Sequence, residues 1–212
     1  MKIKFLPNKV IKFLILSNMA FWFGWGLINP IFAVFVLERI KGGNVFTVGI
    51  AVAIYSFTAA LLRLPIGIIL DSFPSEKDDY FALVAGLFIA SLIPFGYIFI
   101  EIPLHLYILQ AILGIGMAMA LSGWTAIFTR HIDKGKEATE WSLDATSIGL
   151  VTATSSFIGG WTVSKFGFIP VLIWVGVFGL TGALLLFGLK NEIKGVFNHG
   201  LYFSLKDIFK KE

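Results

Sequence analysis

The sequence predicts an all-α membrane protein with six transmembrane helices, and its composition and its long apolar stretches are the observations behind this prediction. Of the 212 residues, 57% are hydrophobic and only 14% are charged, and the mean hydropathy is +0.86. A soluble domain has roughly a quarter of its residues charged, so this chain has too few charges to cover a water-facing surface. A helix of about 20 apolar residues crosses the hydrocarbon core of a bilayer, and six stretches reach that length.

The six predicted spans follow one another closely within residues 1–190, which we interpret as one transmembrane domain. Residues 191–212 form a predicted cytoplasmic tail, in which apolar residues recur at helical spacing between lysines, as in an amphipathic helix at the membrane interface. A partly disordered tail is the alternative. The fifth span is the most polar. The predicted spans are Ile11–Leu37, Val45–Leu70, Tyr80–Ile100, Leu104–Thr129, Trp141–Val163 and Phe168–Leu189.

The distribution of basic residues predicts that both termini lie in the cytoplasm. Most of the 17 lysines and arginines fall in the N-terminal segment, the second–third and fourth–fifth connections and the tail, whereas Arg39, Lys41 and Lys165 fall on the opposite side. Because basic residues gather on the cytoplasmic side, we expect a multi-pass protein of the plasma (inner) membrane, in contact with lipid. The same bias explains the net charge of +4 without a nucleic-acid partner.

The sequence offers no catalytic or metal-binding pattern. It contains no cysteine, which excludes disulfides and thiolate chemistry. The H-E-x-x-H, G-x-S-x-G and G-x-x-x-x-G-K-[ST] motifs do not occur. His105, His131 and His199 fall in separate connections or in the tail, without the spacing of metal ligands. We therefore expect no enzyme activity, no cofactor and no metal ion.

Two ionisable residues lie well inside predicted spans, where a charge is costly and therefore points to a function. Arg63 in the second span and Asp144 in the fifth lie at similar depth, because each is several residues from the cytoplasmic end at a rise of 1.5 Å per residue. We predict an ion pair between them, direct or through Glu140. A purely structural pair, and proton carriage by Asp144 or Glu140, are the alternatives.

Polar and aromatic residues recur along one face of two predicted spans. On the first span, steps of four, three and four residues separate two asparagines and two tryptophans; on the fourth, steps of seven separate a glutamine, a methionine and a tryptophan. Buried amides need a partner or water, so these faces predict an internal, partly wet cavity. An interfacial aromatic belt with interhelical hydrogen bonds is the alternative. The residues expected to bind a small-molecule substrate are Asn18, Trp22, Trp25, Asn29, Tyr55, Gln110 and Trp124.

Several motifs resemble those of the major facilitator superfamily of secondary transporters. Gly67–Asp71, between the second and third spans, resembles the start of the family's G-x-x-x-D loop motif, although Ser72 and the residues after it lack the usual basic run. Arg130, at the end of the fourth span, matches the family's basic residue that faces this aspartate. Gly160–Val171 resembles the family's turn into the last helix of a half.

The resemblance covers nearly the whole chain, but as one six-helix half of a fold that usually has two halves with the solute bound between them. It implies a half-size secondary transporter that moves a small solute by alternating access, driven by a proton or solute gradient. We expect a two-fold homodimer that rebuilds the two-half transporter, because a lone half would expose polar residues such as Asn18 and Asn29 to lipid; pairing with a different half, and a fragment or non-transporting relative, are the alternatives. The aromatic residues suit an amphipathic or aromatic compound, or a sugar. A non-transporting membrane scaffold or accessory subunit is the alternative.

The resemblance also implies where a gate would form. In the family, the second helix of one half packs against the fifth helix of the other. In a homodimer, Arg63 would then pair with Asp144 or Glu140 of the partner subunit, while Asp71 faces Arg130 of its own chain. The residues expected in gating or coupling are Arg63, Asp71, Arg130, Glu140 and Asp144.

Overall fold

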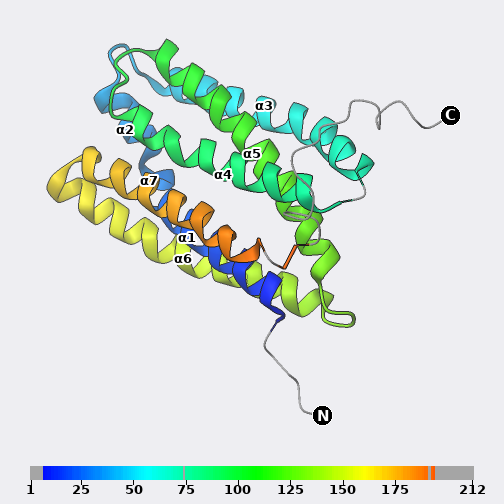
Figure 1. Ribbon diagram of the computed structural model, residues 1–212. Coiled ribbons are helices and arrows are strands. Elements are labelled where there is room, and N and C mark those ends of the chain that lie inside the picture. Colours follow the sequence, from blue (N-terminus) through cyan, green and yellow to red (C-terminus); the bar gives the residue numbers. More distant parts are fainter. Residues whose placement is uncertain (1–6, 74, 191, 194–212) are drawn as a thin grey trace.

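The chain folds into six long helical rods that lie side by side (Figure 1). The computed structural model describes residues 7–73, 75–190 and 192–193, and within them all regular secondary structure is helical. The predicted tail therefore lies outside the described residues except for residues 192 and 193. The elements are α1 (Lys9–Ile28), η1 (Asn29–Ile31), α2 (Phe32–Arg39), α3 (Val45–Ser72), α4 (Lys77–Tyr97), α5 (Pro103–His131), α6 (Glu137–Phe166), α7 (Phe168–Leu185) and η2 (Leu186–Leu189).

The rods confirm the six predicted helices. Five of them are long and apolar enough to cross a membrane: α1 to α2 taken together, α3, α4, α5, and α7 with η2. The sixth, α6, is 30 residues long but is more polar, and it carries buried carboxyl groups at Glu140 and Asp144. A polar helix needs neighbouring protein or water to satisfy these groups in a bilayer, so the surroundings of α6 matter for function.

The first rod is interrupted where the sequence analysis expected one continuous span. Pro30 has no backbone N–H, so the carbonyl of Gly26 loses its usual helical donor, and the chain passes through the short helix η1 before α2 begins. Ser156 Oγ of α6 donates a hydrogen bond of 3.2 Å to this Gly26 carbonyl. The interruption is thus satisfied from a neighbouring helix, as is usual for prolines in membrane helices.

The order of the rods across the bundle differs from their order in the chain. The extensive contacts run from α3 to α5, then to α4, α7, α1 and finally α6. Figure 1 shows α3 and α6 on opposite sides of the bundle. Only 11% of an 18-residue apolar stretch of α3 is buried inside the chain, compared with 44–50% of the matching stretches in the other four apolar rods. Both edge helices therefore present long faces to the surroundings.

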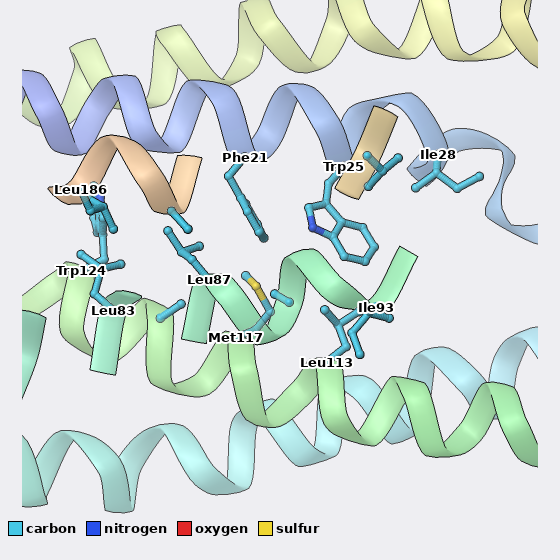
Figure 2. Packing of buried hydrophobic residues seen from close by; sticks show 14 of the residues in the cluster. Phe21, Trp25, Ile28, Leu83, Leu87, Ile93, Leu113, Met117, Trp124 and Leu186 are labelled. Carbon is cyan, nitrogen blue, oxygen red and sulfur yellow. The ribbon is translucent and has the colours of Figure 1, made fainter. Parts of the chain in front are cut away.

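Small residues allow neighbouring helices to approach closely. A Cβ atom on Gly159 of α6 would lie 1.9 Å from the Leu27 carbonyl of α1, and one on Gly86 of α4 would lie 2.4 Å from the Gly116 carbonyl of α5. Close backbone approach of this kind drives helix association in lipid, where hydrophobic collapse contributes little. Larger side chains fill the space between α1, α4 and α5, as Figure 2 shows for Phe21, Leu87 and Met117.

Candidate functional site

A pocket of about 260 Å³ lies between α1, α3, α4 and α5. Its α1 wall is aromatic, and Figure 2 shows Trp25 extending from α1 toward Leu113 and Met117 of α5. Apolar side chains from α3 and α5 complete the wall. The structure brings together here five of the residues expected in a cavity, namely Trp22, Trp25, Asn29, Tyr55 and Gln110.

Three polar atoms on the pocket wall are buried and have no hydrogen-bond partner among the described residues. They are Trp25 Nε1 from α1, Tyr97 Oη from α4 and Gln110 Oε1 from α5. Each buried polar group left unpaired costs about 1–3 kcal/mol, so such groups normally contact ordered water or a ligand. Tyr97 was missed at the sequence level, because a single tyrosine near a helix end has no periodic pattern to mark it.

The other two expected cavity residues do not line this pocket. Asn18, one turn before Trp22, donates through Nδ2 to Asp144 Oδ1 at 3.1 Å. Trp124 stacks on Phe128 with ring centroids 4.4 Å apart, and its ring meets Trp141 of α6 edge-on. Both side chains share a helix face with the pocket residues but lie at a different height along it.

The ion pair expected between Arg63 and Asp144 within one chain is wrong. These residues lie on α3 and α6, at opposite edges of the bundle, and the described residues form no ion pair between Arg63 and either Asp144 or Glu140. Asp144 instead accepts the hydrogen bond from Asn18. Glu140 Oε2 accepts a hydrogen bond of 3.2 Å from the backbone N–H of Asp133.

The carboxyl groups of Glu140 and Asp144 on α6 are both buried inside the chain. Because their partners come from α1 and from the α5–α6 connection, they point toward the bundle and not toward the free face of α6. In this conformation a second unit placed on that face would meet neither Glu140 nor Asp144.

Arg130, at the end of α5, forms a charge cluster with two aspartates. Its Nη1 bonds to Asp79 Oδ2, and its Nη2 lies 3.8 Å from Asp71 Oδ1. The structure therefore brings Arg130 and Asp71 together, as the family resemblance implied. Asp79 is the residue that sequence reasoning missed. It was assigned to a loop, but α4 begins at Lys77 and so places Asp79 in the first helical turn, with a fully buried side chain.

A groove of about 800 Å³ runs between α3 and α5 beside this cluster. Arg63, Asp71 and Arg130 line it together with apolar residues of both helices. The exposed Arg63 makes no ion pair in the part of the chain that the structure describes, although its backbone carbonyl accepts a hydrogen bond of 3.2 Å from Ser122 Oγ. The groove therefore places an available cation next to the exposed face of α3.

An ion pair joins two loops at the opposite end of the bundle from Arg130. Lys41, between α2 and α3, donates to Glu101, between α4 and α5, at 2.7 Å, and the Lys41 N–H donates to the Glu101 carbonyl at 2.8 Å. The side-chain hydrogen bond and the opposite charge raise the pKa of Lys41 and lower the pKa of Glu101. The pair ties together the loops that follow α2 and α4.

A family model described as Major Facilitator Superfamily matches residues 14–200, which include almost all of the six rods. The chain belongs to the major facilitator superfamily. An uncharacterized transporter of Buchnera aphidicola subsp. Schizaphis graminum (strain Sg) is 30% identical over 178 residues, which cover 81% of this chain and 44% of the relative. The chain thus spans less than half the length of this relative.

Membership of the major facilitator superfamily places the helical bundle in a membrane. The chain is a multi-pass integral membrane protein of a transporter family, not of an enzyme family. Proteins of the superfamily bind small-molecule substrates, and the pocket between α1, α3, α4 and α5 is where this member gathers aromatic and unpaired polar side chains.

Proposed function

We propose that this chain is one six-helix unit of a secondary transporter that moves a small solute across the plasma membrane by alternating access. The observation that carries the proposal is the pocket in which Trp25, Tyr97 and Gln110 present unpaired polar atoms from three helices. A scaffold that served assembly alone would gain stability by pairing or removing these atoms. A solute that hydrogen-bonds to them in passing explains why they are left open.

We propose further that a second copy of the chain completes the pathway. Transporters of this kind bind solute at the interface between two structural repeats, and the poorly buried helix α3 and the polar helix α6 offer two edges for such an interface. A two-fold axis along the membrane normal would set α3 of each copy against α6 of the other. Symmetric dimers are the commonest assembly of identical chains.

In this arrangement the Arg130 charge cluster and the Asn18–Asp144 hydrogen bond act as the gate. Arg130 with Asp71 and Asp79 holds α3, α4 and α5 together at the end of the bundle that carries Asp71, and Asn18 with Asp144 holds α1 to α6. Rocking of the two units would strain these contacts in turn. Arg63, on the groove beside α3, would meet Asp144 or Glu140 of the partner subunit only after these carboxylates leave their own bundle.

Cysteine cross-linking tests the assembly, because the chain has no cysteine of its own. Leu61 on α3 and Leu150 on α6 are both exposed and lie at similar depth by helical rise. Two differently tagged copies, one carrying Leu61→Cys and the other Leu150→Cys, should cross-link in the membrane. Val177→Cys on α7, also exposed, is the matched control and should not cross-link to Leu61→Cys. Equal cross-linking of both pairs, or of neither, would contradict the α3–α6 interface.

A further inference from the structure

The wall of the solute pocket carries no charged side chain. All of the residues that line it are aromatic, aliphatic or amide-bearing. The carboxyl group of Asp144 does not reach it, because Asn18 binds that group about one helical turn away. Six rings surround the space, and they come from Phe21, Trp22, Trp25, Phe32, Tyr55 and Tyr97. A charged solute would therefore lose its hydration here without meeting an opposite charge, which is costly.

The unpaired polar atoms specify both kinds of hydrogen-bonding group on the solute. Trp25 Nε1 can only donate, Gln110 Oε1 can only accept, and the Tyr97 hydroxyl can do either. A carboxylate or phosphate offers acceptors alone and, with the Gln110 amide oriented as in this structure, would leave the Gln110 oxygen without a donor. An ammonium group offers donors alone and would leave the Trp25 N–H unpaired. A solute that carries an acceptor and a donor satisfies all three atoms.

The size and walls of the pocket limit the solute further. A volume of about 260 Å³ falls just below the roughly 300–1,000 Å³ of pockets for drug-sized ligands. Flat or ring-shaped solutes pack well against aromatic faces. On the basis of the proposed function, we infer that the solute is an uncharged compound with a single ring. It bears both a hydrogen-bond donor and a hydrogen-bond acceptor.

Matched probes that differ in charge test this inference in nanodiscs containing the full chain. Nicotinamide is neutral, nicotinate is its anionic analogue, and 3-(aminomethyl)pyridine is its cationic analogue. Glucose, glucuronate and glucosamine form a second set with a sugar ring, and the two sets distinguish a heterocyclic from a sugar source. Ligand-observed NMR should show that the neutral member of at least one set binds at least tenfold more tightly than both charged members. The inference would be overturned if a charged member of either set bound more tightly than the neutral member. Tighter binding of choline, a permanent cation, than of the neutral members would overturn it too.

Variants of the pocket give a second readout. Trp25→Phe keeps the ring and removes only the N–H, so the affinity for the neutral probe should fall about three- to tenfold, as expected for one hydrogen bond. Trp174→Phe on α7, outside the pocket, is the control and should leave binding unchanged. Gln110→Glu places an anion in the pocket and should shift preference toward the cationic probe. Unchanged affinity for the neutral probe in Trp25→Phe, together with unchanged probe preference in Gln110→Glu, would contradict the inference.

Failure of this inference differs from failure of the proposed function. If a charged probe bound in preference and its uptake into liposomes that contain the chain depended on Gln110, the chain would still be a transporter and only the assigned solute class would fall. If no probe of either set bound and the pocket were sealed from water, both proposals would fall together.

Discussion

Arg130 offers the sharpest test of the charge cluster, because it contacts one buried and one exposed aspartate. The side chain of Asp79 is 0% exposed, whereas that of Asp71 is 79% exposed and lies 3.8 Å from the guanidinium. Arg130→Gln leaves the carboxylate of Asp79 buried without a counter-charge. Such a change typically lowers the free energy of unfolding by about 3–5 kcal/mol. The Arg130 side chain is 34% exposed, so water can reach it. We therefore expect a loss of unfolding free energy at the low end of this range, about 3 kcal/mol.

The matched variants distinguish the effect of burying a carboxylate from the effect of placing one near Arg130. Asp71→Asn removes an exposed charge next to the same arginine and should cost less than about 1 kcal/mol. Adding Asp79→Asn to Arg130→Gln removes the stranded charge and should restore more than half of the loss. Chemical unfolding in mixed micelles, followed by circular dichroism, measures all three. Equal losses for Arg130→Gln and Asp71→Asn, or no recovery in the double variant, would refute the reasoning.

Other predictions concern the helix contacts and the loops. Gly159→Ala forces α1 and α6 apart and should cost about 1–3 kcal/mol of unfolding free energy, whereas Gly160→Ala, with open space around its Cβ position, should not destabilise. Ser156→Ala removes the hydrogen bond at the break in the first rod and should cost about 1 kcal/mol in the same assay. Lys41→Gln should return the lowered pKa of Glu101 upward toward its ordinary value of 4.5, as NMR titration of that carboxyl would show; an unchanged pKa would contradict the pair. The contribution of the Lys41–Glu101 ion pair to stability should be present above pH 4.5 and lost as the pH falls through the lowered pKa of Glu101.

The sequence predicted the elements of this fold better than their arrangement. Hydropathy located the helices, because crossing the hydrocarbon core demands long apolar stretches, although only five of the six rods are apolar enough to meet that demand by composition. It did not reveal that Pro30 interrupts the first rod, since the effect of a proline depends on whether a neighbour such as Ser156 can satisfy the freed carbonyl. It also placed the start of α4 too late, which hid Asp79 in a supposed loop.

The candidate site shows the same limit. Helical periodicity placed the asparagines and tryptophans of the first rod on one face, and five expected cavity residues do line one pocket. Periodicity predicts on which face of a helix a residue lies, but not which residues of the neighbouring helices lie at the same level along the bundle. Asn18 was therefore assigned to the pocket, although it binds Asp144. The in-chain pair of Arg63 with Asp144 failed because the order of helices across a bundle is a property of tertiary packing.

Water access to the pocket tests the central claim most directly. A single cysteine at Gln110→Cys, in the chain reconstituted in liposomes, should react with a membrane-impermeant maleimide and be protected by a bound solute. Ser91→Cys is the control, because Ser91 is fully buried and bonds to the Leu87 carbonyl of its own helix. We predict labelling at position 110 and none at position 91. If both positions stay unreactive, no aqueous pathway reaches the unpaired polar atoms, and the six helices serve assembly alone.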